Sequence, residues 1–231
     1  MFITLEGGEG AGKSTQAALL YDRLLIGGYR ARLTREPGGT PLASAIRSLV
    51  LHPEASLHAL AASNLTGEAE TEHEPMLPMT ELLLYSGARA QHVVRLREWL
   101  AAGEIIVCDR YADATRVYQG VARGIDATTI ATLEHLVTGG LLPDITFLFD
   151  VPVDEGQRRR RRGKKTGAQW DRLDAETSAF HELVRQGYLD IAAAEPERWI
   201  VLDATLSPDD LEQQIWGLVK DRLPPQTMSS S

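Results

Sequence analysis

The chain has 231 residues, of which 43% are hydrophobic and 24% are charged. These proportions are typical of a globular protein with one core and exclude a chain that is disordered throughout. With 24 basic and 32 acidic residues the net charge is -8, which argues against a general binder of nucleic acids or membrane surfaces, so we expect neither as a partner.

Short β-branched or aromatic runs alternate along the chain with amphipathic stretches of helix length. This alternation is typical of a parallel sheet whose crossover helices cover it. The predicted fold class is therefore α/β, with a five-stranded parallel sheet flanked by helices on both faces. The predicted strands are Phe2–Glu6, Arg30–Thr34, Glu104–Cys108, Ile145–Asp150 and Trp199–Asp203. Ligands of such sheets bind beyond the carboxyl ends of the strands.

Apolar residues at helical spacing predict the helices between these strands. The predicted helices are Lys13–Ile26, about Met79–Ala102, Ala127–Val137 and Glu176–Ala194. The weakly patterned stretch over residues 53–78, which contains several prolines, predicts an exposed and partly mobile insertion. We expect a single domain over residues 1–223 and a flexible tail over residues 224–231.

The sequence favours a cytoplasmic protein. The N-terminal MFITLEGGEG has neither a basic leader nor an apolar segment of signal-peptide length, so we expect an unprocessed chain. No apolar run approaches the ~18 residues that a membrane-spanning helix requires. Cys108 is the only cysteine and cannot form an intramolecular disulfide, which agrees with a reducing compartment.

A phosphate-binding loop is the strongest motif. GGEGAGKS fits the pattern G-x-x-x-x-G-K-[ST] between the first predicted strand and the first predicted helix. In such a loop the backbone amides surround phosphates, Lys13 reaches the outer phosphates and Ser14 binds Mg²⁺. The motif predicts a site for ATP and Mg²⁺ made by Gly7, Gly8, Glu9, Gly10, Ala11, Gly12, Lys13, Ser14 and Thr15. An ATPase, a GTPase switch and a small-molecule kinase all share it.

Other features favour a kinase among these three. N-K-x-D and D-x-x-G elements of a GTPase are absent from the sequence, and 231 residues leave little room for the second lobe of a mechanical ATPase. A kinase for a phosphorylated acceptor needs a second anion site that faces the first. Asp109 follows the run EIIVC, where it can hold Mg²⁺ together with Ser14, and Arg110 and Arg47 also follow strands. We therefore predict a compact kinase.

Eight segments resemble the bacterial thymidylate kinase family in order and spacing from residue 2 to about residue 205. They are EGGEGAGKS (Glu6–Ser14), TREPGGT (Thr34–Thr40), IRSLVL (Ile46–Leu51), YSGARAQ (Tyr85–Gln91), DRYADATRVYQG (Asp109–Gly120), RGID (Arg123–Asp126), PDITFLFDV (Pro143–Val151) and DRLDAE (Asp171–Glu176). The resemblance implies a P-loop NTPase fold, transfer of the γ-phosphate of ATP to dTMP to give dTDP in dTTP biosynthesis, and a homodimer.

The resemblance also implies roles for individual residues. Glu9 matches the acidic residue that contacts the 3′-hydroxyl of the deoxyribose. Arg47 and Arg110 match the arginines that clamp the acceptor phosphate, for which bidentate guanidinium groups are suited. Tyr85 and Arg89 are four residues apart and hence on one face of a helix, and in the family this pair stacks on thymine and hydrogen-bonds its O4.

Further acceptor contacts follow from the DRYADATRVYQG segment. Thr115 corresponds to the residue that reads the thymine edge near N3, Tyr118 to the aromatic that crowds the sugar 2′ position, and Gln119 to an auxiliary substrate-binding residue. The sequence departs from the family pattern at Ala114, where a serine is usual, and at Arg116, where a small residue is usual.

The cluster RRRRRGKK resembles the lid of these kinases, at about residues 157–173. In the bacterial subtype the phosphate loop lacks an arginine, as it does here, and the lid supplies the cation that stabilises the transition state. We expect Arg159 and Arg162 to act in this way, with Arg172 as a third candidate. Together with Lys13 and Arg110 they form the predicted catalytic set.

Two alternatives remain open from the sequence. One is a kinase for another nucleoside monophosphate, and the other is a catalytically silent nucleotide-binding regulator. The six histidines include His52, His58 and His73, whose spacings suit no metal motif, so we expect no histidine metal site.

Overall fold

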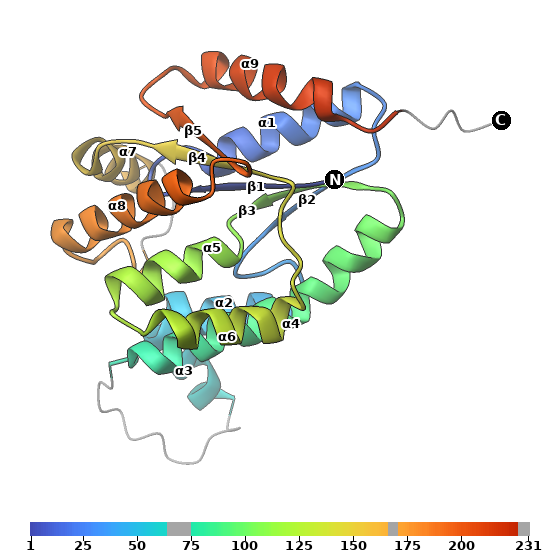
Figure 1. Cartoon of the computed structure of the whole chain (residues 1–231). Coiled ribbons are helices and arrows are strands. Elements are labelled where there is room, and N and C mark those ends of the chain that lie inside the picture. Colours follow the sequence, from blue (N-terminus) through green and yellow to red (C-terminus); the bar gives the residue numbers. More distant parts are fainter. Residues whose placement is uncertain (64–74, 166–170, 226–231) are drawn as a thin grey trace.

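Within residues 1–63, 75–165 and 171–225, which the computed structural model of the protein describes, five strands form one parallel sheet (Figure 1). They are β1 (Phe2–Gly7), β2 (Ala31–Arg35), β3 (Ile105–Asp109), β4 (Ile145–Asp150) and β5 (Trp199–Asp203), in the spatial order β2-β3-β1-β4-β5. The predicted fold class is confirmed, and each strand begins and ends within one residue of its predicted bounds.

The burial of each strand follows its place in the sheet. Every residue of β1 and β3 is buried, whereas the edge strands β2 and β5 expose several residues. Central strands covered on both faces contain near-continuous apolar runs, which is why they were easy to predict. Where hydroxyl groups enter this core they pair, as Thr4 and Thr146 do at 2.9 Å between β1 and β4.

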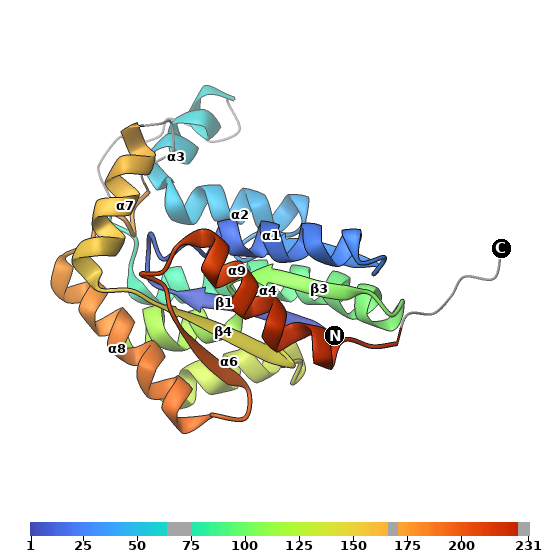
Figure 2. The same cartoon turned by 90° about the horizontal axis from the view of Figure 1, so that it is seen from above.

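Helices cover both faces of the sheet. They are α1 (Lys13–Ile26), α2 (Pro41–Leu51), α3 (Pro53–Ala62), α4 (Pro78–Ala101), α5 (Ala112–Thr115), the π-helical segment η1 (Arg116–Ala122), α6 (Ala127–Thr138), α7 (Val153–Lys165), α8 (Ser178–Ala194), α9 (Pro208–Val219) and the 3₁₀ turn η2 (Lys220–Arg222). Figure 1 shows α1 and α9 on one face, with α4, α5 and α8 on the other. Figure 2 shows α7 at one end of the sheet, directly after β4.

The predicted helices are present, and α1 has the predicted bounds. The region 53–78 differs from prediction, because α3 occupies Pro53–Ala62. Its low amphipathicity hid it, although Pro at the first position and the alanines and leucines that follow favour a helix. The predicted exposure is confirmed for most of residues 53–59. Residues 64–74 of the insertion, 166–170 of the lid and 226–231 of the tail lie outside the described residues.

Chain topology brings the site together. Because β1 lies between β3 and β4, the loops that follow these three strands meet at the same edge of the sheet. The glycine-rich loop follows β1, Asp109-Arg110 follows β3, and α7 follows β4. Segments about 100 residues apart in sequence therefore share one cleft. None of the helices in the described part of the chain is long and apolar enough to cross a membrane.

Candidate active site

The phosphate loop connects β1 to α1 and lines a cleft of about 720 Å³. Gly10 has a φ of +73°, and a Cβ there would lie 2.1 Å from the carbonyl oxygen of Gly156 in α7, so no other residue fits. No side chain caps the first turn of α1, where Gly12 is the N-cap. The free amides of this turn, with the helix dipole, provide an anion site.

Lys13 begins α1 and is 6% exposed. Its Nζ donates a hydrogen bond to the Gly8 carbonyl at 2.6 Å, which holds the side chain over the loop. Burial, together with the nearby positive charge of Arg110, lowers the pKa of Lys13 to about 8, although Glu9 and Asp109 act in the opposite direction. A phosphate brought to the loop would reverse this effect by supplying negative charge.

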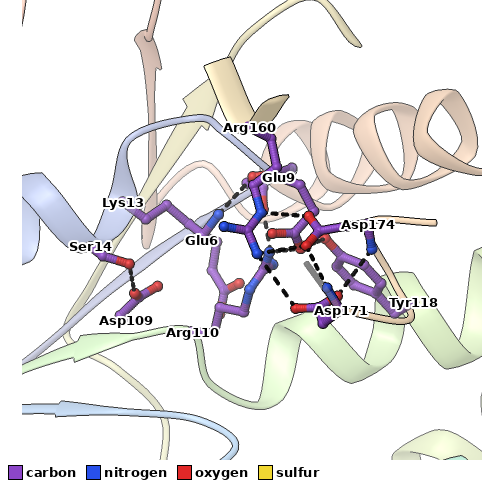
Figure 3. Close-up of polar contacts among 12 residues, drawn as sticks. Glu6, Glu9, Lys13, Ser14, Asp109, Arg110, Tyr118, Arg160, Asp171 and Asp174 are labelled. Carbon is purple, nitrogen blue, oxygen red and sulfur yellow. Dashed lines mark hydrogen bonds and ion pairs between the residues drawn. The ribbon is translucent and has the colours of Figure 1, made fainter. Parts of the chain in front are cut away.

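Ser14 and Asp109 form a pair of oxygen ligands beside the loop. The Ser14 hydroxyl donates a hydrogen bond to Oδ2 of Asp109, which ends β3 (Figure 3). Mg²⁺ prefers such oxygen ligands and is usually held by one or two protein groups together with phosphates and water. In the described ranges, no group of three or more His, Cys, Asp or Glu residues is arranged to hold a metal. The two oxygens therefore fit an ion shared with bound phosphates.

Arg110 follows Asp109 and turns its side chain into the cleft. Its φ of 68° lies in the left-handed region, which is unfavourable for a residue with a Cβ. The guanidinium donates to the Gly7 carbonyl at 2.9 Å and forms an ion pair with Glu9. Burial opposes the charge of Arg110, but Glu9 outweighs it, so the pKa of Arg110 is raised well above its ordinary value.

Glu9 is ionised in this arrangement. Burial raises its pKa, but the charges of Arg110 and Lys13 together lower the pKa by more than burial raises it. The Tyr118 hydroxyl, which donates to Glu9 Oε1 at 3.0 Å, also lowers it. The net effect is a pKa of about 2. Figure 3 shows Glu9 and Arg110 pointing toward one another between the phosphate loop and Tyr118. The loop thus carries a fixed anion as well as the amides that attract one.

A second, smaller pocket adjoins the cleft. It is lined by Glu9, Glu36, Pro37, Arg47, Leu51, Tyr85, Arg89, Arg110, Tyr111, Ala114, Thr115, Tyr118, Gln119, Asp171 and Leu173. The structure brings all the predicted acceptor-binding residues together here, from α2, α4, α5, η1 and the loops after β1 and β3. Arg116, one departure from the family pattern, pairs with Asp113 and Glu195 outside this pocket.

Tyr85 and Arg89 lie on one face of α4, as predicted from their spacing, and both are buried. The Arg89 guanidinium donates to Thr115 Oγ1 at 3.0 Å and forms an ion pair with Glu36 at 2.7 Å. These contacts fix the plane of the guanidinium and use part of its hydrogen-bonding capacity. The remaining N–H groups and the flat face of Tyr85 suit a planar polar ring.

Sequence reasoning missed the support of Arg89. His92, which is fully buried one turn further along α4, contacts Glu36 at 2.9 Å through Nδ1 and Thr34 at 2.8 Å through Nε2. Glu36 is therefore held by two partners, and its pKa is lowered, because Arg89 and His92 outweigh the effect of burial. The segment TREPGGT contained Glu36, but only the contact with α4 reveals its partners.

Arg47 and Gln119 both line the smaller pocket. Arg47 donates to the Pro37 carbonyl at 3.2 Å and lines both cavities, so it lies where the two meet. Burial, then the charge of Arg35, lowers its pKa. The Gln119 amide donates to Glu81 at 2.6 Å, which leaves its carbonyl oxygen for a ligand.

The lid arginines divide into two groups. Arg159, Arg160 and Arg162 line the cleft from α7. Arg172, the third predicted candidate, does not: its guanidinium donates to the Val50 carbonyl and forms an ion pair with buried Glu81. Glu81 therefore compensates the charge of Arg172, and this ion pair keeps Arg172 away from the phosphate loop.

Arg160 was not predicted and lies closest to the acidic residues that follow the lid. It binds Asp174 through two hydrogen bonds of 2.6 Å and approaches Asp171 at 3.9 Å. Figure 3 shows this group beside Glu9 and Arg110. The sequence could not indicate which of the five consecutive arginines face the cleft, because that depends on how α7 is rotated relative to the phosphate loop.

The thymidylate kinase family model matches residues 5–66 and 62–215. Thymidylate kinases from Desulfosudis oleivorans and Deinococcus radiodurans are 50% and 45% identical to the chain, over 88% and 96% of it and 89% and 97% of their own lengths. The crystal structure of thymidylate kinase from Ehrlichia chaffeensis is similar, with a TM-score of 0.68 and 30% identity over 95% of this chain and 98% of that one.

The lowered pKa of Lys13 leads to a first prediction. Inorganic tripolyphosphate should bind with full affinity below about pH 8, and its affinity should fall as pH rises above that value, because Lys13 then loses its charge in the free protein. The dissociation constant should be measured by calorimetry from pH 7 to 9.5. A Lys13→Arg variant keeps its charge throughout and serves as the matched control, so a wild-type profile as flat as that of the variant would contradict the prediction.

Proposed function

This chain belongs to the thymidylate kinase family, and we propose that it transfers the γ-phosphate of ATP, with Mg²⁺, to dTMP to give dTDP. The enzyme is a kinase of nucleotide biosynthesis. One observation carries the detailed proposal: two cationic sites face each other in connected cavities, one at the phosphate loop and one at Arg110 and Arg47.

The donor and acceptor phosphates are held from opposite sides. The loop amides and Lys13 bind the outer phosphates of ATP, whereas Arg110 and Arg47 bind the phosphate of dTMP. Two phosphates repel each other, and surrounding cations reduce this repulsion and hold the groups in line. The acceptor phosphate already carries a nucleophilic oxygen anion, so no residue has to remove a proton from it.

Ser14 and Asp109 would hold Mg²⁺ beside the donor phosphates. When bound, the ion supplies positive charge that offsets the charge of those phosphates. The short contact between the Ser14 hydroxyl and Asp109 supports this assignment, because both oxygens already converge on one point beside the loop.

The nucleoside of dTMP occupies the smaller pocket. Tyr85 stacks on thymine, while Arg89, Thr115 and Gln119 provide donors and acceptors for its edge. Tyr118 and Glu9 face the sugar, the first against the 2′ position and the second toward the 3′-hydroxyl. Because Glu36 and His92 hold Arg89, the base meets a preorganised donor.

The lid supplies positive charge to the transferring phosphoryl group. Arg162 is the strongest candidate, since it lines the cleft and its guanidinium has no hydrogen-bond or ion-pair partner among the described residues. Arg159 is already held by Glu155 and by the Ala204 carbonyl, so it is suited to orient the donor nucleotide. Arg172 is not proposed for this role, because Glu81 holds it elsewhere.

Two further properties are proposed from the same premise. The enzyme acts in the cytoplasm, together with the other steps of nucleotide biosynthesis. It forms a homodimer through an exposed apolar stripe on α4, formed by Leu83, Gly87, Ala90 and Val94, of which Leu83 and Val94 are 51% and 55% exposed. Small residues in the middle of such a stripe allow two helices to approach closely.

A nucleotide panel tests the function. In a coupled ADP-release assay with Mg-ATP, dTMP should have the highest kcat/KM, and dUMP should be lower by about 1–3 kcal/mol of transition-state binding, because a single methyl group separates them. Lys13→Ala and Arg110→Ala should each lower turnover by roughly two orders of magnitude or more. Higher activity on AMP or CMP would favour the alternative kinase, and binding without turnover would favour a silent regulator.

The lid assignment has its own test. Arg162→Ala should lower kcat by roughly 10³-fold, the lower range for an arginine that stabilises the transition state. Arg161 is the matched control, since it is exposed on the same helix and does not line the cleft. Equal kcat values for Arg162→Ala and Arg161→Ala would contradict the assignment.

Sedimentation velocity tests the dimer. Val94→Glu places a charge at one end of the stripe, in place of one of its two large apolar side chains, and should convert the protein to a monomer. Ile26→Glu is the control, because Ile26 is 88% exposed at the end of α1, on the other face of the sheet. A Val94→Glu variant that sediments like the wild type would exclude this interface.

A further inference from the structure

Arg110, Tyr188 and Glu6 form a chain of hydrogen bonds, and neither Tyr188 nor Glu6 lines the cleft or the smaller pocket. The Arg110 Nη1 donates to the Tyr188 hydroxyl at 3.1 Å, and Tyr188 donates to Glu6 Oε2 at 2.8 Å. Glu6 and Tyr188 are both fully buried. The chain joins three elements, because Glu6 belongs to β1, Tyr188 to α8, and Arg110 to the segment after β3.

The contacts of the Arg110 guanidinium determine which of its edges is free. A guanidinium has five N–H groups. The Gly7 carbonyl and the Tyr188 hydroxyl use both hydrogens of Nη1, and Glu9 uses one of Nη2. None of these three contacts uses Nε, and the edge that Nε forms with Nη2 is suited to bind an oxyanion in bidentate fashion.

The same carboxyl group also holds the backbone of this segment. Glu6 Oε1 accepts a hydrogen bond of 2.6 Å from the Tyr111 amide, directly after Arg110 with its left-handed φ of 68°. Such a conformation is unfavourable for a residue with a Cβ and persists only where the surroundings impose it. Glu6 therefore constrains Arg110 twice, through the backbone of the next residue and through the Tyr188 hydroxyl.

We propose that Tyr188, anchored by Glu6, is a positioning residue that sets the plane of the Arg110 guanidinium so that its Nε edge faces the acceptor phosphate. The proposal rests on the proposed function and deepens it, since it adds a residue that never touches dTMP. Tyr188 lies on α8, the helix that follows the lid in the chain, so the acceptor clamp depends on a helix outside both nucleotide pockets.

The chemistry of the pair supports a positioning role rather than simple packing. The Tyr188 ring packs against Tyr118 and Trp199, and a phenylalanine ring would fill the same space. A buried carboxyl group is costly, and burial, then repulsion by Asp113, raises the pKa of Glu6 to about 8. The bridge survives in either protonation state, since a neutral Glu6 donates to the tyrosine oxygen and an ionised Glu6 accepts from it.

Tyr188→Phe tests the proposal because it removes only the hydroxyl. The dissociation constant of dTMP should rise about 10- to 100-fold, the expected effect of losing a hydrogen bond to a charged group. The affinity of thymidine, which has no phosphate, should stay within twofold of the wild-type value. Tyr29→Phe, a partly buried tyrosine on the other face of the sheet, is the control and should change neither constant.

A double-mutant cycle separates positioning from general damage. In the Arg110→Ala background, Tyr188→Phe should have no further effect on dTMP binding, because its target is already gone. Equal losses in both backgrounds, or an equal loss of thymidine affinity, would overturn the positioning role. Failure of the proposed function is distinct, because the wild-type protein would then neither bind nor phosphorylate dTMP.

Discussion

The partly buried ion pair between Glu9 and Arg110 is the interaction on which the rest of the site depends. It joins the loop after β1 to the segment after β3, and it places a cation and an anion at the boundary between the two cavities. A guanidinium held away from water without a partner would be strongly unfavourable, so Glu9 compensates the charge that Arg110 carries there. The low pKa of Glu9 and the raised pKa of Arg110 are two expressions of this coupling.

Two of the arginines that line the smaller pocket are supported by buried polar partners. Arg89 is paired with Glu36, which His92 also contacts. Arg110 donates to Tyr188, which in turn is hydrogen-bonded to Glu6. Polar groups in a core are stable only when they are fully hydrogen-bonded, and a fully satisfied chain is also rigid. The cost of burying these groups is thus linked to the precision with which the two arginines are held.

The lid is connected to both nucleotide sites by packing at its two ends. At the start of α7, a Cβ on Gly10 would clash with the Gly156 carbonyl oxygen, and a Cβ on Gly156 would clash with the Glu9 carbonyl oxygen, so neither glycine can carry a side chain. At the end of the lid, Arg172 binds Glu81 on α4, one turn before Tyr85, and Glu81 also accepts from Gln119. Displacement of the lid therefore perturbs the phosphate loop at one end and the base pocket at the other.

By itself the sequence determined the strands, most of the helices, the phosphate loop and the family, because these depend on local pattern and on motifs of fixed spacing. Tyr85 and Arg89 were placed on one face by helical period alone, and Ser14 and Asp109 by their positions after strands. Tertiary structure alone decided the partners of Glu6, Glu36 and His92, and turned Arg172 toward Glu81. These contacts join residues from about 50 to 180 positions apart, and no local pattern encodes which buried polar groups will meet once the sheet and its helices have packed.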